Sequence, residues 1–246
     1  MDAQVTYLCA YVGTKWPPVW VERLYRMLEA KSSVPFDFRV ITDKPDMFPE
    51  WGVQISRPVV PTVEVPYSKY KDGETLWLHS NKPMGCWAKL DAFLPKWGSN
   101  PIICFDLDVT IVGDPYQLVR KELHMAAEEP AGHPAPNGSI YSYTPGYLPE
   151  DFDVSIIPWE TRRKGEQEWV AEKTGAKLFR DGTYSFKHHI ACRGGRIPPD
   201  TIVVFHHGFP TPAHPQVRQL EWVGWTWKNL EPLDRDKWEA FIHEGI

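Results

Sequence analysis

The sequence contains no run of about 18 apolar residues, the length that a helix needs to cross a bilayer, so it predicts no transmembrane segment. It also lacks the basic start and the cleavage site of a signal peptide. The first residues, MDAQVTYLCAYVGTKW, pass from an acidic residue directly into a strand pattern. These absences predict a cytoplasmic protein.

Cysteine and positive charge are also scarce. The four cysteines, Cys9, Cys86, Cys104 and Cys192, lie far apart and form no C-x-x-C pair, which argues against a zinc site. Cys9 and Cys104 lie in apolar runs, where a buried, reduced thiol is the ordinary state. The net charge is −5, so the composition predicts no basic surface for nucleic acid.

Apolar residues, in contrast, are abundant enough for a substantial core. They make up 42% of the 246 residues, and we find neither an internal repeat nor a long low-complexity linker. We expect a single domain over residues 1–246, with 216–246 as a C-terminal extension. The 12 tryptophans suit either a core or the face of a sugar, and Trp159 and Trp169 are candidates for the second role.

The pattern of apolar residues predicts an α/β fold. Strands are expected at 5–12, 36–45, 124–130 and 201–207, with a buried strand in 101–115 that runs into FDLDVT. Helices are expected at 17–31, 84–97 and 165–175. Residues 57–80 and 131–151 are expected to be irregular, the latter with at most one short strand. The strand–helix–strand unit at the start favours a mostly parallel central sheet with flanking helices.

Two unrelated chemistries would explain FDLDVT at 105–110. In a phosphatase of the haloacid dehalogenase type, Asp106 would attack phosphorus, but such an enzyme needs a later D-x-x-x-D cluster, and no such cluster follows a strand here. Alternatively, Asp106 and Asp108 would hold Mn²⁺ or Mg²⁺ against the diphosphate of a nucleotide-sugar, because carboxylates are the hard ligands that these ions prefer. Both readings place the acids at a strand end, where α/β proteins bind ligands.

A second motif, TIVVFHHGFPTPAHP at 201–215, favours the metal–diphosphate reading. An apolar strand leads into His206 and His207, and a neutral imidazole is a good metal ligand. Gly208 follows, and a glycine lets the backbone approach a phosphate closely. The sequence leaves open whether His206 or His207 is the ligand.

Taken in order, ITDKP, GCWAKLDAF, IICFDLDVTIVGD and FHHGFPTPAHP resemble the GT-A glycosyltransferases of the glycogenin- and lipopolysaccharide-galactosyltransferase-like group, over about residues 3 to 215. The F-H-G-x-P pattern is most similar to bacterial and phage members. The resemblance implies a hexosyltransferase-like enzyme that uses a nucleotide-sugar donor, most often linked to UDP, with retention of configuration. The acceptor, whether a sugar, a lipid-linked sugar or a protein, is not implied.

The resemblance also assigns roles to residues. It implies that Tyr11, Thr14 and Asp43 contact the nucleotide and that Lys89 faces the donor. Asp106, Asp108 and His207 would be the metal ligands, with Gly208 beside the phosphates. The lysine that follows the late histidine in better-known members is missing here, and Lys187, in YSFKHHI, is the candidate to replace it. Glu166-Gln167 stands where the group often has Asp-Gln. The candidate catalytic residues are therefore Lys89, Lys187 and Glu166.

Two questions stay open at this point. A general base for an inverting reaction could be Asp153, Glu160 or Glu166. The missing lysine and the glutamate at position 166 would also fit a domain that binds nucleotide-sugars without turnover.

Overall fold

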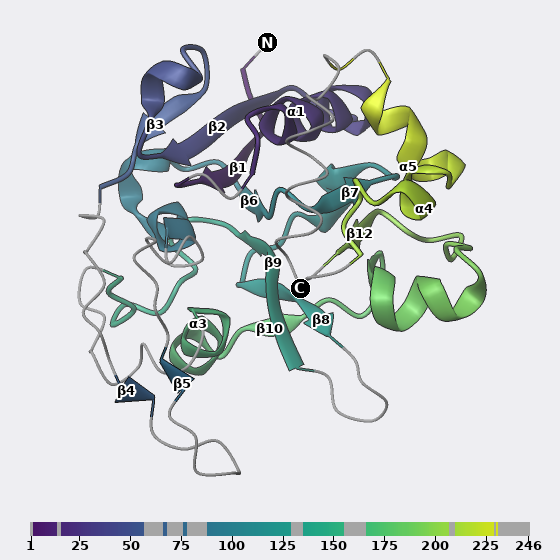
Figure 1. Ribbon diagram of the computed structural model, residues 1–246. Coiled ribbons are helices and arrows are strands. Elements are labelled where there is room, and N and C mark those ends of the chain that lie inside the picture. The colour runs from purple at the N-terminus through teal and green to yellow at the C-terminus, as the bar shows by residue number, and fades with distance from the viewer. Residues whose placement is uncertain are drawn as a thin grey trace.

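The computed structural model describes residues 2–13, 16–56, 88–128, 135–154, 166–206, 210–228 and 230, and the backbone of 66–67 and 76–77. A seven-stranded sheet is its centre (Figure 1). In spatial order its strands are β10 (Lys177–Leu178), β8 (His124–Glu128), β9 (Ala135–Tyr143), β6 (Ile102–Phe105), β1 (Val5–Tyr11), β2 (Phe36–Thr42) and β3 (Gly52–Gln54). Four of the six strand pairs are parallel, and only β9 runs against its neighbours β6 and β8. The predicted α/β class with a mostly parallel sheet is confirmed.

The central strands are buried on both faces, as expected for parallel strands covered by helices. In β1, Tyr7 and Cys9 point into one core cluster, whereas Leu8 between them points into the other. This alternation follows from the two-residue period of a strand. The first cluster packs against helix α1 (Val19–Lys31), and the second packs against the 3-10 helix η2 (Lys89–Phe93) and helix α3 (Glu166–Thr174).

A smaller sheet adjoins the large one and contains β11 (Thr183–Ser185), β12 (Val203–Phe205) and β7 (Val109–Ile111) in that order. β6 ends at Phe105 and β7 begins at Val109. The segment 106–108 is therefore the turn that carries the chain from the large sheet into the small one. A separate antiparallel pair consists of β4 (Pro66–Tyr67) and β5 (Leu76–Trp77).

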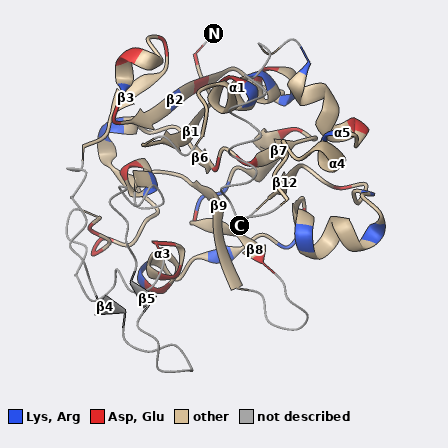
Figure 2. Ribbon diagram, viewed as in Figure 1, with Lys and Arg blue, Asp and Glu red and all other residues tan. Residues whose placement is uncertain are grey.

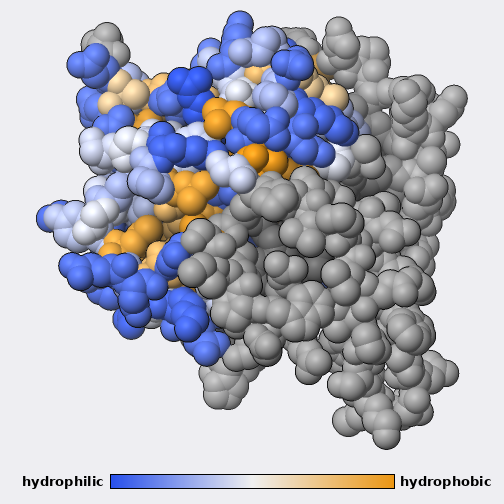
Figure 3. Space-filling view, turned by 90° about the vertical axis from the view of Figure 1, so that its left-hand side faces the viewer, coloured by the Kyte–Doolittle hydropathy of each residue, from blue (hydrophilic) through white to orange (hydrophobic). Residues whose placement is uncertain are grey.

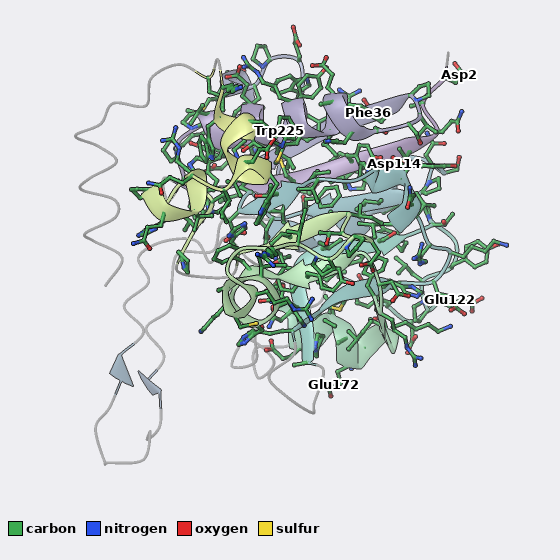
Figure 4. All side chains as sticks on the ribbon, turned by 90° about the vertical axis from the view of Figure 1, so that its right-hand side faces the viewer. Asp2, Phe36, Asp114, Glu122, Glu172 and Trp225 are labelled. Carbon is green, nitrogen blue, oxygen red and sulfur yellow. The ribbon has the colours of Figure 1, made fainter. Side chains whose placement is uncertain are left out.

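The described part of the predicted C-terminal extension, residues 216–228 and 230, packs on α1. It contains α4 (Pro215–Arg218), α5 (Glu221–Gly224) and the 3-10 helix η8 (Trp225–Trp227). Val217, Val223 and Trp227 belong to the same core cluster as α1. Figure 4 shows Trp225 where this segment meets the N-terminal part of the chain, and the Lys31 ammonium lies 5.3 Å from the centre of its ring.

Two sequence-based expectations are wrong. The predicted helix at 84–97 is not continuous over its described residues: two 3-10 helices, η2 and η3 (Pro95–Trp97), are separated by Leu94, which is extended because it precedes Pro95. The predicted loop at 131–151 contains the long buried strand β9. Its Pro-Asn-Gly-Ser composition is typical of a turn, but the pairing with β6 and β8 overrides that local preference. The predicted excursion at 57–80 lies outside the described residues apart from the backbone of β4 and β5.

The remaining described elements are short. They are η1 (Pro45–Met47), η4 (Pro115–Leu118), the π-helical turn η6 (Phe186–Ile190) and η7 (Ala191–Arg193). Within the described ranges, no helix is both long and apolar enough to cross a bilayer. Acidic and basic positions are interspersed along the ribbon (Figure 2). On the face in Figure 3, a hydrophobic band runs between hydrophilic residues and borders the undescribed ones.

Candidate functional site

The candidate site lies at one edge of the large sheet, where β1, β2, β6 and β8 all end. Register sets this arrangement, because Tyr11 pairs with Thr42 and Cys9 pairs with Phe105. Tyr11, Asp43 and Asp106 therefore stand at the carboxyl ends of adjacent parallel strands, which is where ligands bind in open α/β sheets.

Tyr11 and Asp43 form the part of this edge nearest β2. Tyr11 is buried and packs edge-on against Phe48, with ring centres 5.0 Å apart, and burial together with the nearby Asp43 carboxylate raises its pKa. Asp43 accepts a hydrogen bond of 3.3 Å from the Gly13 amide, and Lys44 donates one of 3.1 Å to the Gly13 carbonyl. The end of β2 thus holds the loop after β1, a loop that includes Thr14, which lies outside the described residues.

Lys89 connects the first acid of the D-x-D motif to helix α3. Its ammonium lies 2.9 Å from Asp106 Oδ1 and 2.9 Å from Glu166 Oε1, and it donates a 2.8 Å hydrogen bond to the Gly138 carbonyl. The Lys89 and Glu166 side chains are only 7% and 6% exposed, whereas Asp106 is 31% exposed. Burial alone would lower the pKa of Lys89, but the carboxylates of Asp106 and Glu166 outweigh it and raise the pKa well above its usual value.

Residues of strand β9 contact both members of this ion pair. Tyr141 donates a 3.1 Å hydrogen bond to Glu166, and the Gly138 amide donates one of 3.0 Å to Gln167. A Cβ at Gly138 would lie 2.6 Å from Glu166 Oε1, 2.8 Å from the Tyr141 hydroxyl and 3.2 Å from Lys89 Nζ. Glycine is therefore required at this position, because a larger residue would occupy the space of the ion pair.

The second acid of the motif, Asp108, is joined to the late histidine strand. β12 pairs antiparallel with β7, and the His206 amide continues this ladder by donating a 3.2 Å hydrogen bond to the Asp108 carbonyl. The His206 ring is 2% exposed and stacks on Phe186, with ring centres 4.8 Å apart. The sequence motifs at 105–110 and 201–206 are thus brought side by side, as a shared site requires.

Sequence reasoning missed a further acid at this edge, Glu128, which ends β8. Its carboxylate accepts a 3.1 Å hydrogen bond from the Asn137 amide group, and His188 Nε2 lies 3.5 Å from its other oxygen. Asn137 in turn accepts from the Ser139 amide, and the Ser139 carbonyl accepts from the Asp106 amide at 2.9 Å. The strand-end rule, applied to the predicted strand at 124–130, would have selected Glu128.

The other candidate residues divide into three groups. Lys187 is exposed in the first turn of η6, directly after the end of β11. Asp153 is exposed, whereas Trp169 is 3% exposed and packs against Phe152 in the core, so the idea that it stacks on a sugar is wrong. Four further candidates lie outside the described residues: Trp159, Glu160, His207 and Gly208.

The donor set suits a hard divalent cation. Asp106 and Asp108 are half-buried carboxylates that flank one residue at a turn, and Asp106 meets Lys89 through Oδ1. The described residues include no group of three potential ligands. A third ligand would therefore come from His207, which directly follows the last described residue of the β12 segment, or from the substrate.

Comparison with solved structures identifies the fold as that of GT-A glycosyltransferases. The galactosyltransferase LgtC, in complex with donor and acceptor sugar analogues, superposes with a TM-score of 0.62 at 10% identity, over 96% of this chain and 99% of that one. The glycosyltransferase GlyE of Streptococcus pneumoniae TIGR4 gives 0.56 at 12% identity, over 99% of this chain but 63% of its own. Mouse xyloside xylosyltransferase 1 gives 0.50 at 10% identity, over 82% and 97%.

No family model matches the sequence, and no curated protein matches it either. At these identities the likeness concerns the fold, and the chemistry has to be argued from the residues at the strand ends.

Proposed function

We propose that this protein is a metal-dependent glycosyltransferase that transfers a sugar from a UDP-linked donor to an acceptor hydroxyl, with retention of configuration. The observation that carries the proposal is the position of Asp106 and Asp108. In a GT-A fold, they form the turn between the two sheets, at the edge where the parallel strands end. This is where a diphosphate and its metal ion would meet both carboxylates.

Asp106, Asp108 and His207 are the proposed ligands of Mn²⁺ or Mg²⁺. His207 is preferred over His206 because the His206 ring is enclosed by Phe186 on one face and lies 3.3 Å from Thr110 through Nε2. When bound, the metal ion would neutralise the charge that develops on the departing nucleoside diphosphate. Gly208 and the exposed Lys187 are the proposed phosphate contacts from the chain itself.

Lys89 is proposed to hold the Asp106 carboxylate in a fixed orientation. The ammonium is itself fixed by Glu166 and by the Gly138 carbonyl, so the first ligand is oriented before the donor arrives. Glu166 begins α3 and lies against the same cation, and it is the proposed catalytic carboxylate. Tyr11, Thr14 and Asp43 are proposed to receive the uracil and ribose at the ends of β1 and β2.

The retaining outcome rests on the resemblance to the glycogenin-like group. The acceptor remains a sugar, a lipid-linked sugar or a protein, because no described residue distinguishes among them. Interspersed charges and a net charge of −5 argue against nucleic acid.

A thermal-shift panel of UDP, GDP, CDP and ADP, each with and without Mn²⁺, tests the proposal. A ligand at 100 times its Kd adds about 2.7 kcal/mol of stability. We expect a shift for UDP that requires Mn²⁺ and disappears in Asp108→Ala, followed by hydrolysis of a UDP-sugar. Binding without any turnover would indicate a domain that only binds nucleotide-sugars. No shift, together with release of phosphate from an aryl phosphate, would revive the phosphatase reading.

A further inference from the structure

Arg23 is a fully buried arginine behind the D-x-D turn, on the inner face of α1. Among the described residues no carboxylate forms an ion pair with it. All three of its hydrogen bonds go to neutral groups instead: the Val109 carbonyl at 2.7 Å, the Thr110 hydroxyl at 2.8 Å and the Thr226 hydroxyl at 2.9 Å. A buried charge is costly unless each donor is satisfied in a fixed geometry, so the fold retains this group at a considerable energetic cost.

Two of these bonds go to residues next to the candidate metal ligands. Val109 follows Asp108 in the chain, and the Thr110 hydroxyl lies 3.3 Å from His206 Nε2. One planar guanidinium therefore fixes the backbone after the second acid and the hydroxyl that contacts the histidine strand. A fork of donors in fixed geometry suits this task better than the single ammonium of a lysine.

The third bond reaches the C-terminal segment. Thr226 accepts from Arg23 and donates a 2.7 Å hydrogen bond to the Val223 carbonyl at the end of α5. The Trp227 ring covers the guanidinium at 4.9 Å, and Trp20 lies 5.9 Å away on another side. Burial lowers the pKa of Arg23 to about 9, while the nearby Asp108 carboxylate acts in the opposite direction.

A second contact joins the same two regions independently of Arg23. Trp222 in α5 lies 6.3 Å from the His206 ring in a stacked orientation and donates a 3.0 Å hydrogen bond to the Gly195 carbonyl. The C-terminal segment therefore supports the histidine strand through Trp222 and the D-x-D turn through Thr226.

We infer that Arg23 is a positioning residue for the metal–diphosphate site, and that it makes the C-terminal segment, through Thr226, part of the support of that site. This inference rests on the proposed function only for the identity of the ligand, a nucleoside diphosphate with its metal ion. Arg23 touches neither donor nor metal in this scheme, since it acts through Val109, Thr110 and the segment that they hold. Removing the Thr226 end of the connection should therefore loosen a turn more than 100 residues earlier in the chain.

Hydrogen exchange of the ligand-free protein tests the coupling. The variants are Thr226→Val, which keeps the side-chain shape, Arg23→Lys and Arg23→Met, with Arg26→Met as the control. Arg26 lies on the same helix but is 38% exposed and pairs with Glu22. We expect faster exchange at 105–111 and 203–206 in Thr226→Val and Arg23→Lys, with residues 36–54 unchanged, and no effect in Arg26→Met. Faster exchange confined to 215–228 would overturn the inference.

The Kd for UDP with Mn²⁺, measured well below the unfolding temperature, tests the positioning role. An allosteric coupling of ordinary size predicts at least about fivefold weaker binding in Thr226→Val, and weaker still in Arg23→Met, with partial recovery in Arg23→Lys. Destabilised variants that retain the wild-type Kd would mean that Arg23 only supports the fold. If the wild type binds no nucleotide, the proposed function fails, whereas the exchange result still decides whether Thr226 and the D-x-D turn are coupled.

Discussion

Lys89 lies 2.9 Å from the carboxylate of Asp106, so the first acid of the D-x-D motif is paired with a buried cation. The same ammonium lies 2.9 Å from Glu166. Two acids and one cation form a compact cluster in which Asp106 alone faces the solvent to an appreciable extent. This arrangement orients the Asp106 carboxylate and places one cation between two like charges.

Replacing this cation should therefore be costly. In Lys89→Met the buried Glu166 carboxylate loses its counter-charge, and breaking a buried pair in this way costs about 3–5 kcal/mol. Urea unfolding at pH 7 measures the loss. The double variant Lys89→Met/Glu166→Gln is the control, because it removes the uncompensated charge and should recover part of the stability. A single variant as stable as the wild type would show that the cluster does not hold this corner of the fold.

Gly138 provides a second test of the same cluster. Alanine at this position would place its Cβ 2.6 Å from Glu166 Oε1 and 2.8 Å from the Tyr141 hydroxyl. We expect Gly138→Ala to lower the free energy of unfolding by about 1–3 kcal/mol, as overpacking does, and to weaken donor binding, since Lys89 must move. The measurement is thermal unfolding combined with a titration of UDP and Mn²⁺.

Tyr141→Phe gives the matched control for this clash. It removes one of the two atoms closest to the new methyl group, so Gly138→Ala/Tyr141→Phe should be more stable than the sum of the two single effects predicts. Strict additivity would mean that the methyl group is accommodated elsewhere.

The sequence predicted the strand ends around the candidate site better than the contacts between its side chains. The positions of Tyr11, Asp43 and Asp106 at strand ends follow from apolar runs, and parallel strands bring their ends to one edge. The contact of Tyr11 and Asp43 with a nucleotide was implied only by the family resemblance and stays a prediction. The ion pair between Lys89 and Glu166 could not be derived in this way. It depends on β9, whose Asn-Gly-Ser composition predicts a turn, and on the packing of two helices that are distant in sequence, which brings Lys89 and Glu166 together beside Gly138.

Two further questions that the sequence left open depend on which side chains are buried. The sequence alone could not assign Trp169 to the core or to a sugar platform, since an aromatic residue serves in both. It could not decide between His206 and His207 either, because adjacent residues at a strand end face different sides. The structure places Trp169 in the core. It also buries His206, which leads to the prediction that His207 is the metal ligand.

Trp169 is expected to matter for stability and not for acceptor binding. In Trp169→Phe a smaller ring replaces a buried indole that packs against Phe152, and a core truncation of this kind costs roughly 1–3 kcal/mol. Urea unfolding should show this loss, whereas KM for any acceptor that is identified should not change. An increase in KM at unchanged stability would return Trp169 to the role of a sugar platform.

The two histidines should separate cleanly into a structural and a functional residue. His206 is 2% exposed and stacked on Phe186, so phenylalanine can occupy most of its volume. His206→Phe leaves the Thr110 hydroxyl with one contact fewer and should cost about 1–2 kcal/mol of stability, with little change in Mn²⁺-dependent UDP binding.

His207→Ala should have the opposite effects. It should leave the unfolding of the ligand-free protein unchanged and weaken Mn²⁺-dependent UDP binding at least about tenfold, since even the outer contacts of a metal site are worth that much. Calorimetric titration of both variants with UDP and Mn²⁺, next to their unfolding curves, distinguishes the two roles. If His206→Phe abolishes the Mn²⁺ dependence and His207→Ala does not, His206 is the ligand, and its ring must leave the Phe186 stack when the metal ion binds.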